Sequence, residues 1–180
     1  MSNNKEAGNR NRLKPLRILA ISSAGGHWVQ LQRLRSAWDG CHVAYVTSKA
    51  EYEPDVMEDA RRREQRPPRF YKIIEANRWK KADLIRQCAQ ILAILIRERP
   101  HVIVTTGAAP GFFALLLGKI LRSRTIWIDS IANAEEMSLS GQKAKSFADL
   151  WLTQWEHLSG GSGGGASPDR DKPDYKGAVL

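Results

Sequence analysis

A pair of glycines followed by a histidine stands where an apolar run gives way to a helical pattern. The segment Ser23-Ala24-Gly25-Gly26-His27 follows Leu16 to Ile21, a run typical of a buried strand. Glycines let the backbone approach a ligand closely, and the first amides of a helix attract anions. A histidine at that point can accept a proton or donate a hydrogen bond to phosphate. The pattern predicts a phosphate or diphosphate site with His27 beside it, and the alternative is a structural turn with an ordinary histidine.

Two further strand ends carry small or polar residues. Thr106 to Gly111 is a turn of small residues that should open on the same sheet edge as His27. Asp129 and Ser130 end another strand-like run, where the aspartate can orient a sugar or a base and the serine can bind phosphate. An acid at a strand end is more often a cap or turn residue. The polar loop expected over 131–145 carries Glu135 and Glu136, which we expect to be solvated.

The elements that position these turns alternate along the chain. Strand-like runs cover residues 16–21, 42–47, 70–75, 101–105, 125–129 and 150–153. Helical patterns cover residues 28–38, 50–63, 79–99 and 112–121. This alternation predicts an α/β fold, with a Rossmann-like, mostly parallel sheet and helices on both faces. Ligands are expected at the carboxyl ends of its strands.

The composition narrows the classes of function. A net charge of +9 favours an anionic partner, which is a nucleic acid, a phosphorylated ligand or an acidic membrane. The basic residues between Arg61 and Arg69 form either a solvated face or a contact for anionic lipid. The fingerprints G-x-G-x-x-G and G-x-x-x-x-G-K-[ST] are absent, which argues against dinucleotide and P-loop sites. Cys41 and Cys88 are expected to be buried free thiols, and no metal site is expected.

The 180 residues suit one domain. We expect a disordered tail over residues 1–14, a domain over 15–158, a flexible Gly/Ser-rich loop over 159–172 and a C-terminal tail over 173–180. The stretch Ser159 to Ser167 has the composition of either a natural loop or an inserted linker. No apolar run reaches the roughly 18 residues that cross a bilayer.

Several segments, in this order, resemble a known family. Ser23 to His27 is similar to the glycine-rich loop of GT-B glycosyltransferases of the lipid II-forming, MurG type. A half-size relative resembles the chain over roughly Leu16 to Leu180. Its fourth strand and glycine turn resemble Pro100 to Gly107, and its "ES-x-A-x-x-x-S-L-S/T-G" segment resembles Ile128 to Gly141. Its "AD-x-x-x-x-QW-E" segment resembles Ala148 to Glu156, and its "Y-x-G" ending resembles Tyr175 to Ala178. This relative is the oligosaccharide biosynthesis subunit of the Alg-fourteen type, whose bacterial form is the exopolysaccharide protein PssD.

The resemblance implies one half of a split glycosyltransferase, a single domain of the GT-B N-terminal type. This half would bind a polyprenyl-diphosphate-linked sugar in polysaccharide (exopolysaccharide or capsule) biosynthesis, while a partner chain binds the UDP-sugar, so no cofactor is expected here. The subunit would form a heterodimer and attach peripherally to the cytoplasmic face of the inner membrane, through basic residues and an apolar patch on an anionic surface. Its C-terminal end would recruit the partner, through Tyr175, Gly177, Val179 and Leu180.

The resemblance also implies roles for the residues at the strand ends. His27 is the candidate that takes a proton from the acceptor hydroxyl or stabilises phosphate. The diphosphate would bind at Ser23, Gly25, Gly26, Gly107 and Ser130. Asp129 and Glu135 are further candidates in the cleft.

Two other classes of function make different predictions. A self-sufficient small enzyme that binds nucleotide sugars would bind nucleotide without a partner, and the missing fingerprints argue against it. A nucleic-acid-binding module using Arg61 to Arg69 would bind oligonucleotides with a steep dependence on salt. No recognised nucleic-acid motif occurs and the basic residues are scattered, which argues against that class.

Overall fold

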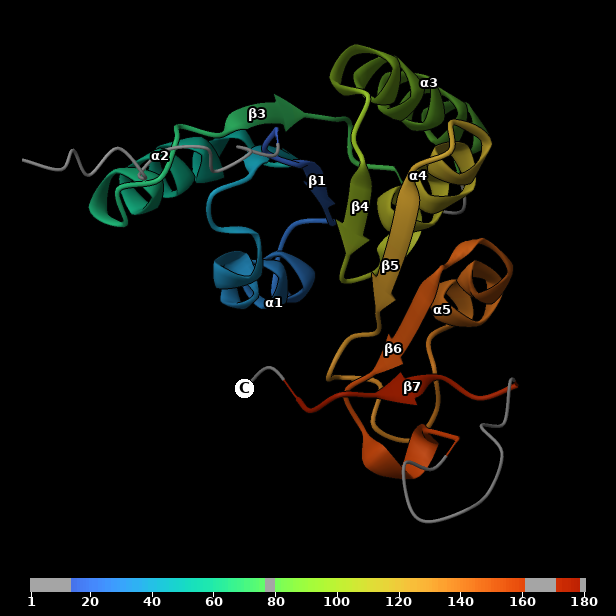
Figure 1. The fold of residues 1–180 in the computed structure, drawn as a ribbon. Helices are drawn as coiled ribbons and strands as arrows, with labels where there is room; N and C mark the ends of the chain where they lie inside the picture. The colour runs from blue at the N-terminus through green and yellow to red at the C-terminus, as the bar shows by residue number, and fades with distance from the viewer. Residues whose placement is uncertain (1–13, 77–79, 161–170, 179–180) are drawn as a thin grey trace, which may run out of the picture.

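A seven-stranded parallel sheet forms the centre of the protein (Figure 1). The computed structural model describes residues 14–76, 80–160 and 171–178. The strand order is β3-β2-β1-β4-β5-β6-β7, and every neighbouring pair runs parallel. The strands are β1 (Arg17–Ile21), β2 (His42–Thr47), β3 (Arg69–Lys72), β4 (Val102–Thr105), β5 (Arg124–Ile128), β6 (Leu150–Thr153) and β7 (Asp174–Tyr175). The expectation of a Rossmann-like sheet is confirmed.

Helices cover both faces of this sheet (Figure 1). One face carries α1 (Gly26–Arg33) and α2 (Glu53–Arg62), and the other carries α3 (Lys81–Glu98), α4 (Ala108–Ile120) and α5 (Leu139–Ala144). Short 3-10 turns occur at η1 (Arg35–Trp38), η2 (Ala50–Tyr52), η3 (Lys145–Phe147) and η4 (Glu156–Leu158).

The side chains of β1 alternate between two buried clusters, one on each face of the sheet. Leu19 and Ile21 belong to the cluster that includes residues of α3, α4 and α5. Ile18 and Ala20 belong to the cluster that includes residues of α1 and α2. This alternation follows from the two-residue period of a strand, and it explains why the run is apolar throughout.

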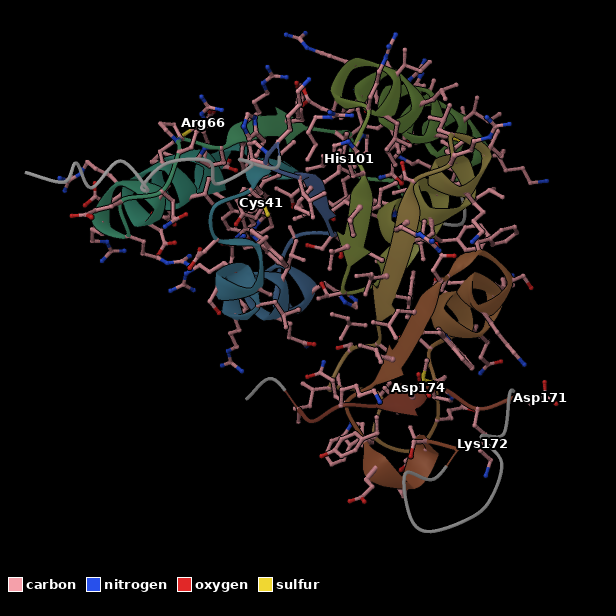
Figure 2. All side chains as sticks on the ribbon, viewed as in Figure 1. Cys41, Arg66, His101, Asp171, Lys172 and Asp174 are labelled. Atoms are coloured by element: carbon pink, nitrogen blue, oxygen red, sulfur yellow. The ribbon has the colours of Figure 1, made fainter. Side chains whose placement is uncertain are left out.

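Several boundaries differ from those expected from sequence. The helix expected over 28–38 is divided into α1 and η1, because bonds three residues apart take over at Leu34 and Ala37. Helix α4 begins at Ala108 and not at Phe112. Pro110 is tolerated in its first turn because the amides there have no partner within the helix. The cysteines Cys41 (Figure 2) and Cys88 are free, and they are half-buried rather than buried.

Helix α5 lies within the segment 131–145, which was expected to be a loop. Its six residues are too few to show an apolar stripe in the sequence. The helix is instead marked by its cap, because the Ser138 hydroxyl accepts a hydrogen bond from Gly141 N at 2.9 Å. A serine followed by a short polar run was the available signal for this helix.

The strand order reverses between β1 and β4, which are neighbours at the centre of the sheet. After β1 the chain turns to α1 on one face, and after β4 it turns to α4 on the other. The carboxyl ends of these two strands therefore open into a crevice, the usual place for a ligand in such sheets. The loops 22–25 and 106–107 border this crevice.

The C-terminal tail expected over 173–180 contributes the edge strand β7. Leu152 and Thr153 of β6 pair with Asp174 and Tyr175, and Gly160 N donates to the Pro173 carbonyl at 3.2 Å. Gly177 follows in an exposed position with φ of 100°. Val179 and Leu180 lie outside the described residues, as do most of the expected N-terminal tail and Gly/Ser-rich loop.

Asp149 connects the start of β5 to the end of α4. Its carboxylate accepts bonds from Thr125 N at 2.9 Å and from Thr125 Oγ1 at 3.1 Å, and it pairs with Lys119. Partial burial raises the pKa of Asp149, but the bonds from Lys119 and Thr125 outweigh this and hold the pKa below its usual value.

Asp149 should therefore stabilise the fold at neutral pH and lose that effect in acid. The pKa of Asp149 is lower in the folded chain than the value of about 3.9 in the unfolded chain, so its contribution to the free energy of unfolding is present in full above that value. The contribution is lost as the pH falls through the folded-state pKa. Asp149→Asn should lower the free energy of unfolding by about 1–2 kcal/mol at pH 7, with a smaller difference at pH 2. Urea denaturation at both pH values measures this, with exposed Glu75→Gln as control. An equal loss at the two pH values would contradict the electrostatic explanation.

Candidate functional site

His27 is held by the turn that follows β4. Its Nδ1 lies 2.7 Å from the Thr106 carbonyl oxygen, and Thr106 Oγ1 donates to the His27 carbonyl at 2.6 Å. Because a carbonyl only accepts, Nδ1 carries the hydrogen, and the lone pair of the neutral ring is on Nε2. These two bonds join the first turn of α1 to the start of α4, across 79 residues of chain.

Glycines allow the two helix starts to approach each other around the imidazole. Gly107 has φ of 126°, and a Cβ added there would lie 2.8 Å from His27 Cε1. Gly25 precedes α1 with φ of 80°, and its amide donates to the Tyr52 hydroxyl at 3.3 Å. Neither helix start has a side-chain cap. The first amides of α1 and α4 are therefore available on both sides of His27, and they attract an anion.

An open pocket of about 430 Å³ lies beside His27. This volume is within the range of small-molecule sites. Of the residues expected in the site, His27 and Ser130 line it. Ser23 and Gly25 stand in the loop before α1, Gly26 is the first residue of α1, and Gly107 is where a Cβ would meet the imidazole. The other lining residues come from the start of α4, the loop after β5 and the start of α5: Ala108, Ala132, Asn133, Glu136, Met137, Ser138, Leu139 and Ser140.

Asp129 is not in the lining of the pocket, and its carboxylate organises the loop that forms one wall. The residue is 2% exposed. Its Oδ1 accepts from Trp127 Nε1 at 3.1 Å and from Ser138 Oγ at 2.6 Å. Its Oδ2 accepts from Asn133 Nδ2 at 3.0 Å and from Ser138 N at 2.8 Å. Asp129 thus serves as a turn residue, the more common use of an acid at a strand end.

Glu135 also lies outside the pocket that the structure brings together. It is exposed, and its neighbour Glu136 lines the pocket instead. The sequence does not indicate which of these two adjacent glutamates faces the pocket, because the loop after β5 has no periodic pattern.

Two buried glutamines that the sequence interpretation missed hold Ser130 in place. Gln30 Nε2 donates to Ser130 Oγ at 3.0 Å, and Gln30 Oε1 accepts from Ile131 N at 3.2 Å. Gln154 Nε2 donates to Gln30 Oε1 at 2.9 Å and to the Asp129 carbonyl at 2.8 Å. The sequence signal for Gln154 was its place in the "QW-E" segment. The sequence signal for Gln30 was a polar residue within the buried part of α1.

The described residues contain no cluster of three or more side chains suited to a metal ion. The sequence does hold one Asp-x-Asp triplet, Asp169 to Asp171, which the sequence interpretation overlooked. Asp169 and Arg170 lie outside the described residues, and Asp171 Oδ1 accepts from Lys145 Nζ at 2.6 Å.

The family model "Oligosaccharide biosynthesis protein Alg14 like" matches residues 21–163. The chain belongs to this family. The UDP-N-acetylglucosamine transferase subunit ALG14 of Eremothecium gossypii is 25% identical to the Alg14-like chain over 168 residues, which cover 81% of this chain and 75% of that subunit. The subunit of the same name from Yarrowia lipolytica is 31% identical over 77 residues, which cover 39% of this chain and 36% of that subunit. The resemblance noted from the sequence is confirmed at the level of the family.

Solved structures share the fold of this Alg14-like chain. MurG of Acinetobacter baumannii superposes with a TM-score of 0.57 at 11% identity, over 79% of this chain and 42% of MurG. A UDP-N-acetylglucosamine 2-epimerase of Neisseria meningitidis, bound to UDP-GlcNAc, superposes with a TM-score of 0.54 at 10% identity, over 77% of this chain and 40% of that one. The chain spans about two fifths of these proteins, and it has the fold of a GT-B N-terminal domain.

Asp129 should prove more important for stability than for chemistry. Asp129→Ala removes one carboxylate and leaves buried donors of Trp127 and Ser138 without an acceptor. The free energy of unfolding should fall by about 3 kcal/mol or more. The matched change Glu135→Ala, in the same loop but exposed, should alter it by less than about 0.5 kcal/mol. Urea denaturation measures both, and similar small losses would contradict the structural role of Asp129.

Proposed function

We propose that this chain is the acceptor-binding subunit of a two-component UDP-sugar glycosyltransferase. The observation that carries the proposal is His27, held between two uncapped helix starts beside an open pocket at the β1–β4 crevice. Such a site suits a diphosphate next to a hydroxyl that must lose a proton. The names of the two relatives, both transferase subunits, support this reaction class.

The acceptor in this proposal is a polyprenyl-diphosphate-linked sugar, used in polysaccharide (exopolysaccharide or capsule) biosynthesis. Its diphosphate accepts hydrogen bonds from the first amides of α1 and α4. Gly25 and Gly26 have no side chain and leave space for the phosphate oxygens, whereas the missing side chain of Gly107 leaves space for the His27 imidazole. Ser130, which lines the pocket and is fixed by Gln30, contacts the same ligand.

His27 acts as the base in the proposed transfer. The acceptor hydroxyl oxygen attacks the anomeric carbon of the UDP-sugar, and His27 Nε2 accepts the hydroxyl proton. The bond between that carbon and the UDP oxygen breaks, and UDP leaves with the electron pair. The Thr106 carbonyl keeps the proton on Nδ1 and stabilises the imidazolium that forms.

A donor-binding partner subunit supplies the UDP-sugar in this account, so that the two chains act as a heterodimer. The present chain folds as one sheet, and the superposed enzymes are more than twice its matched length. The contact is proposed at the C-terminal tail, where half-buried Tyr175 belongs to the edge strand and Gly177 is exposed beyond it. An edge strand offers unpaired backbone groups to another chain.

A peripheral position on the cytoplasmic face of the inner membrane completes the proposal. No helix in the described ranges has both the length and the apolar character needed to span a bilayer. Helix α3 nevertheless presents an outward apolar stripe, in which Ile85, Leu92 and Ile96 are 70%, 37% and 53% exposed. These positions are spaced by seven and four residues, so they share one side of the helix.

Basic residues at the two ends of this stripe, and Arg86, which pairs with Asp83, favour an anionic bilayer as its occupant. Lys81 and Arg86 lie on α3 itself, and Arg122 follows exposed Ile120 and Leu121 at the end of α4. Helix α3 packs against α4, whose first residue lines the His27 pocket. A membrane along α3 would therefore lie close to the site that takes the lipid diphosphate.

Replacing the proposed base should abolish most of the transfer. In the co-purified pair of subunits, His27→Ala should lower kcat about 10²–10⁴-fold with a smaller change in the KM for the acceptor. His101→Ala, at the opposite edge of the sheet, is the matched control and should retain activity. Turnover of UDP-sugar on a polyprenyl-diphosphate-sugar measures this.

Two outcomes would overturn parts of the proposal. Normal kcat in the His27→Ala pair would show that His27 is not the base. Turnover or tight UDP binding by this chain without a partner would favour a self-sufficient enzyme that binds nucleotide sugars.

Membrane attachment should depend on the α3 stripe. Ile85→Ser with Ile96→Ser should reduce flotation with vesicles of phosphatidylglycerol and phosphatidylcholine, because each change removes an apolar side chain that enters the interface. Val29→Ser, which is 51% exposed and lies on α1 at the other face of the sheet, should leave flotation unchanged. Equal flotation of all three proteins would contradict this attachment surface.

A further inference from the structure

A basin lined by arginines lies at the edge of the sheet opposite the His27 pocket. It has a volume of about 820 Å³. Parallel strands begin at one edge, so the first residues of β1, β2 and β3 meet there with the end of α3. Figure 2 shows Arg66 at this edge, on the side of the molecule away from the crevice. The charged and imidazole side chains in the lining are Arg17, His42, Arg66, Arg69, Arg97, Glu98 and Arg99.

The charge of the arginine basin is strongly unbalanced. Five arginines and one glutamate line it, which leaves a net charge of +4. Glu98 is already occupied, because both of its oxygens accept from Arg69 NH1, at 2.8 and 2.9 Å, and the Tyr71 hydroxyl donates to it as well. The other four guanidinium groups form no ion pair with any acid in the described part of the chain.

All five arginines are exposed, and contacts other than ion pairs hold the guanidinium groups of Arg17 and Arg66. Arg17 Nε donates to the Arg99 carbonyl at 2.8 Å, and Arg17 N donates to His101 Nδ1 at 3.0 Å. Arg66 NH1 lies 2.7 Å from His42 Nε2. Arg99 ends α3 with φ of 45°, which turns the chain back to the sheet. Like charges held together in this way repel one another, and a bound anion would remove that cost.

We propose that the arginine basin is a second anion site, which binds a phosphate ligand with at least two negative charges. Guanidinium groups bind phosphate oxygens through paired hydrogen bonds, and several of them suit a ligand with more than one phosphate oxygen exposed. The ligand is either a soluble polyphosphate or a phospholipid headgroup, which share this chemistry.

This site differs from the proposed diphosphate site at His27. The five residues of β1 separate the two edges of the sheet, a distance of about 17 Å for extended chain. The His27 site uses backbone amides, whereas the basin uses guanidinium groups. The inference stands on the basin residues alone, so failure of the proposed glycosyltransferase function would leave it intact.

The test compares two variants that remove the same charge. Arg66→Gln with Arg97→Gln removes two basin arginines that have no ion pair in the described residues. Arg61→Gln with Arg62→Gln removes two exposed arginines of α2, outside the basin. Calorimetric titration with inorganic tripolyphosphate at low salt measures soluble binding. Flotation measures binding to vesicles containing phosphatidic acid, whose phosphomonoester can carry two negative charges, against pure phosphatidylcholine. Thermal melts confirm that each variant folds.

The basin variant should bind at least one of the two probes about tenfold or more weakly than the wild type, while the α2 variant stays within about twofold. A selective loss of tripolyphosphate binding identifies a soluble ligand, and a selective loss of vesicle binding identifies a headgroup. Arg66→Lys with Arg97→Lys keeps the charge but loses the planar fork, and it should show an intermediate loss. Equal losses in the basin and α2 variants, or a wild type that binds neither probe, would overturn the proposal.

Discussion

The paired hydrogen bonds between His27 and Thr106 are the constraint on which the site depends. They join the end of β4 to the first turn of α1, so the two loops at the strand-order reversal are held in one arrangement. They also fix the tautomer of the imidazole. Gly107 is required by the same arrangement, because any side chain there would occupy the space of the ring. This contact therefore depends on the residue types at positions 27, 106 and 107 and on the backbone conformation there, and the proposed chemistry depends on this contact.

The two edges of the sheet handle negative charge by different physical means. At the carboxyl edge, uncapped amides of α1 and α4 provide partial charges in fixed directions, with His27 beside them. At the amino edge, full charges on arginines gather around a single glutamate. The net charge of +9 predicts an anionic partner, but it does not indicate where on the protein that partner binds. A binding site forms only where the fold brings charged side chains together.

The fold was predictable from sequence because local patterns agree with the global arrangement. The strands His42–Thr47 and Leu150–Thr153 occur as expected, since buried parallel strands are short apolar runs bounded by turn residues. The crevice at His27 was also predictable, because small residues follow β1 and β4 at the same edge. Helix α5 was missed because it is held by a cap and by contacts of the loop rather than by an apolar stripe.

The roles of Asp129 and Gln30 could not be assigned from sequence. Gln30 acts across long separations, such as the 124 residues to Gln154. The donors to the Asp129 carboxylate are close in sequence, in Trp127, Asn133 and Ser138, but most of them belong to a loop without a periodic pattern. Periodicity reports which side of an element is buried, and it does not report which buried polar groups will pair. Asp129 has the residue type of a ligand contact, yet four internal donors use its carboxylate.

The most direct test of the central claim is an NMR titration of the ¹⁵N-labelled chain with a short-chain prenyl diphosphate. The claim is that the amides around His27 bind the acceptor diphosphate. Saturable shifts should appear at the amides of Gly25, Gly26, His27, Gly107 and Ala108, and His27 Nε2 should respond with them. Shifts confined to the arginine basin, with none at the two glycine loops, would contradict the account.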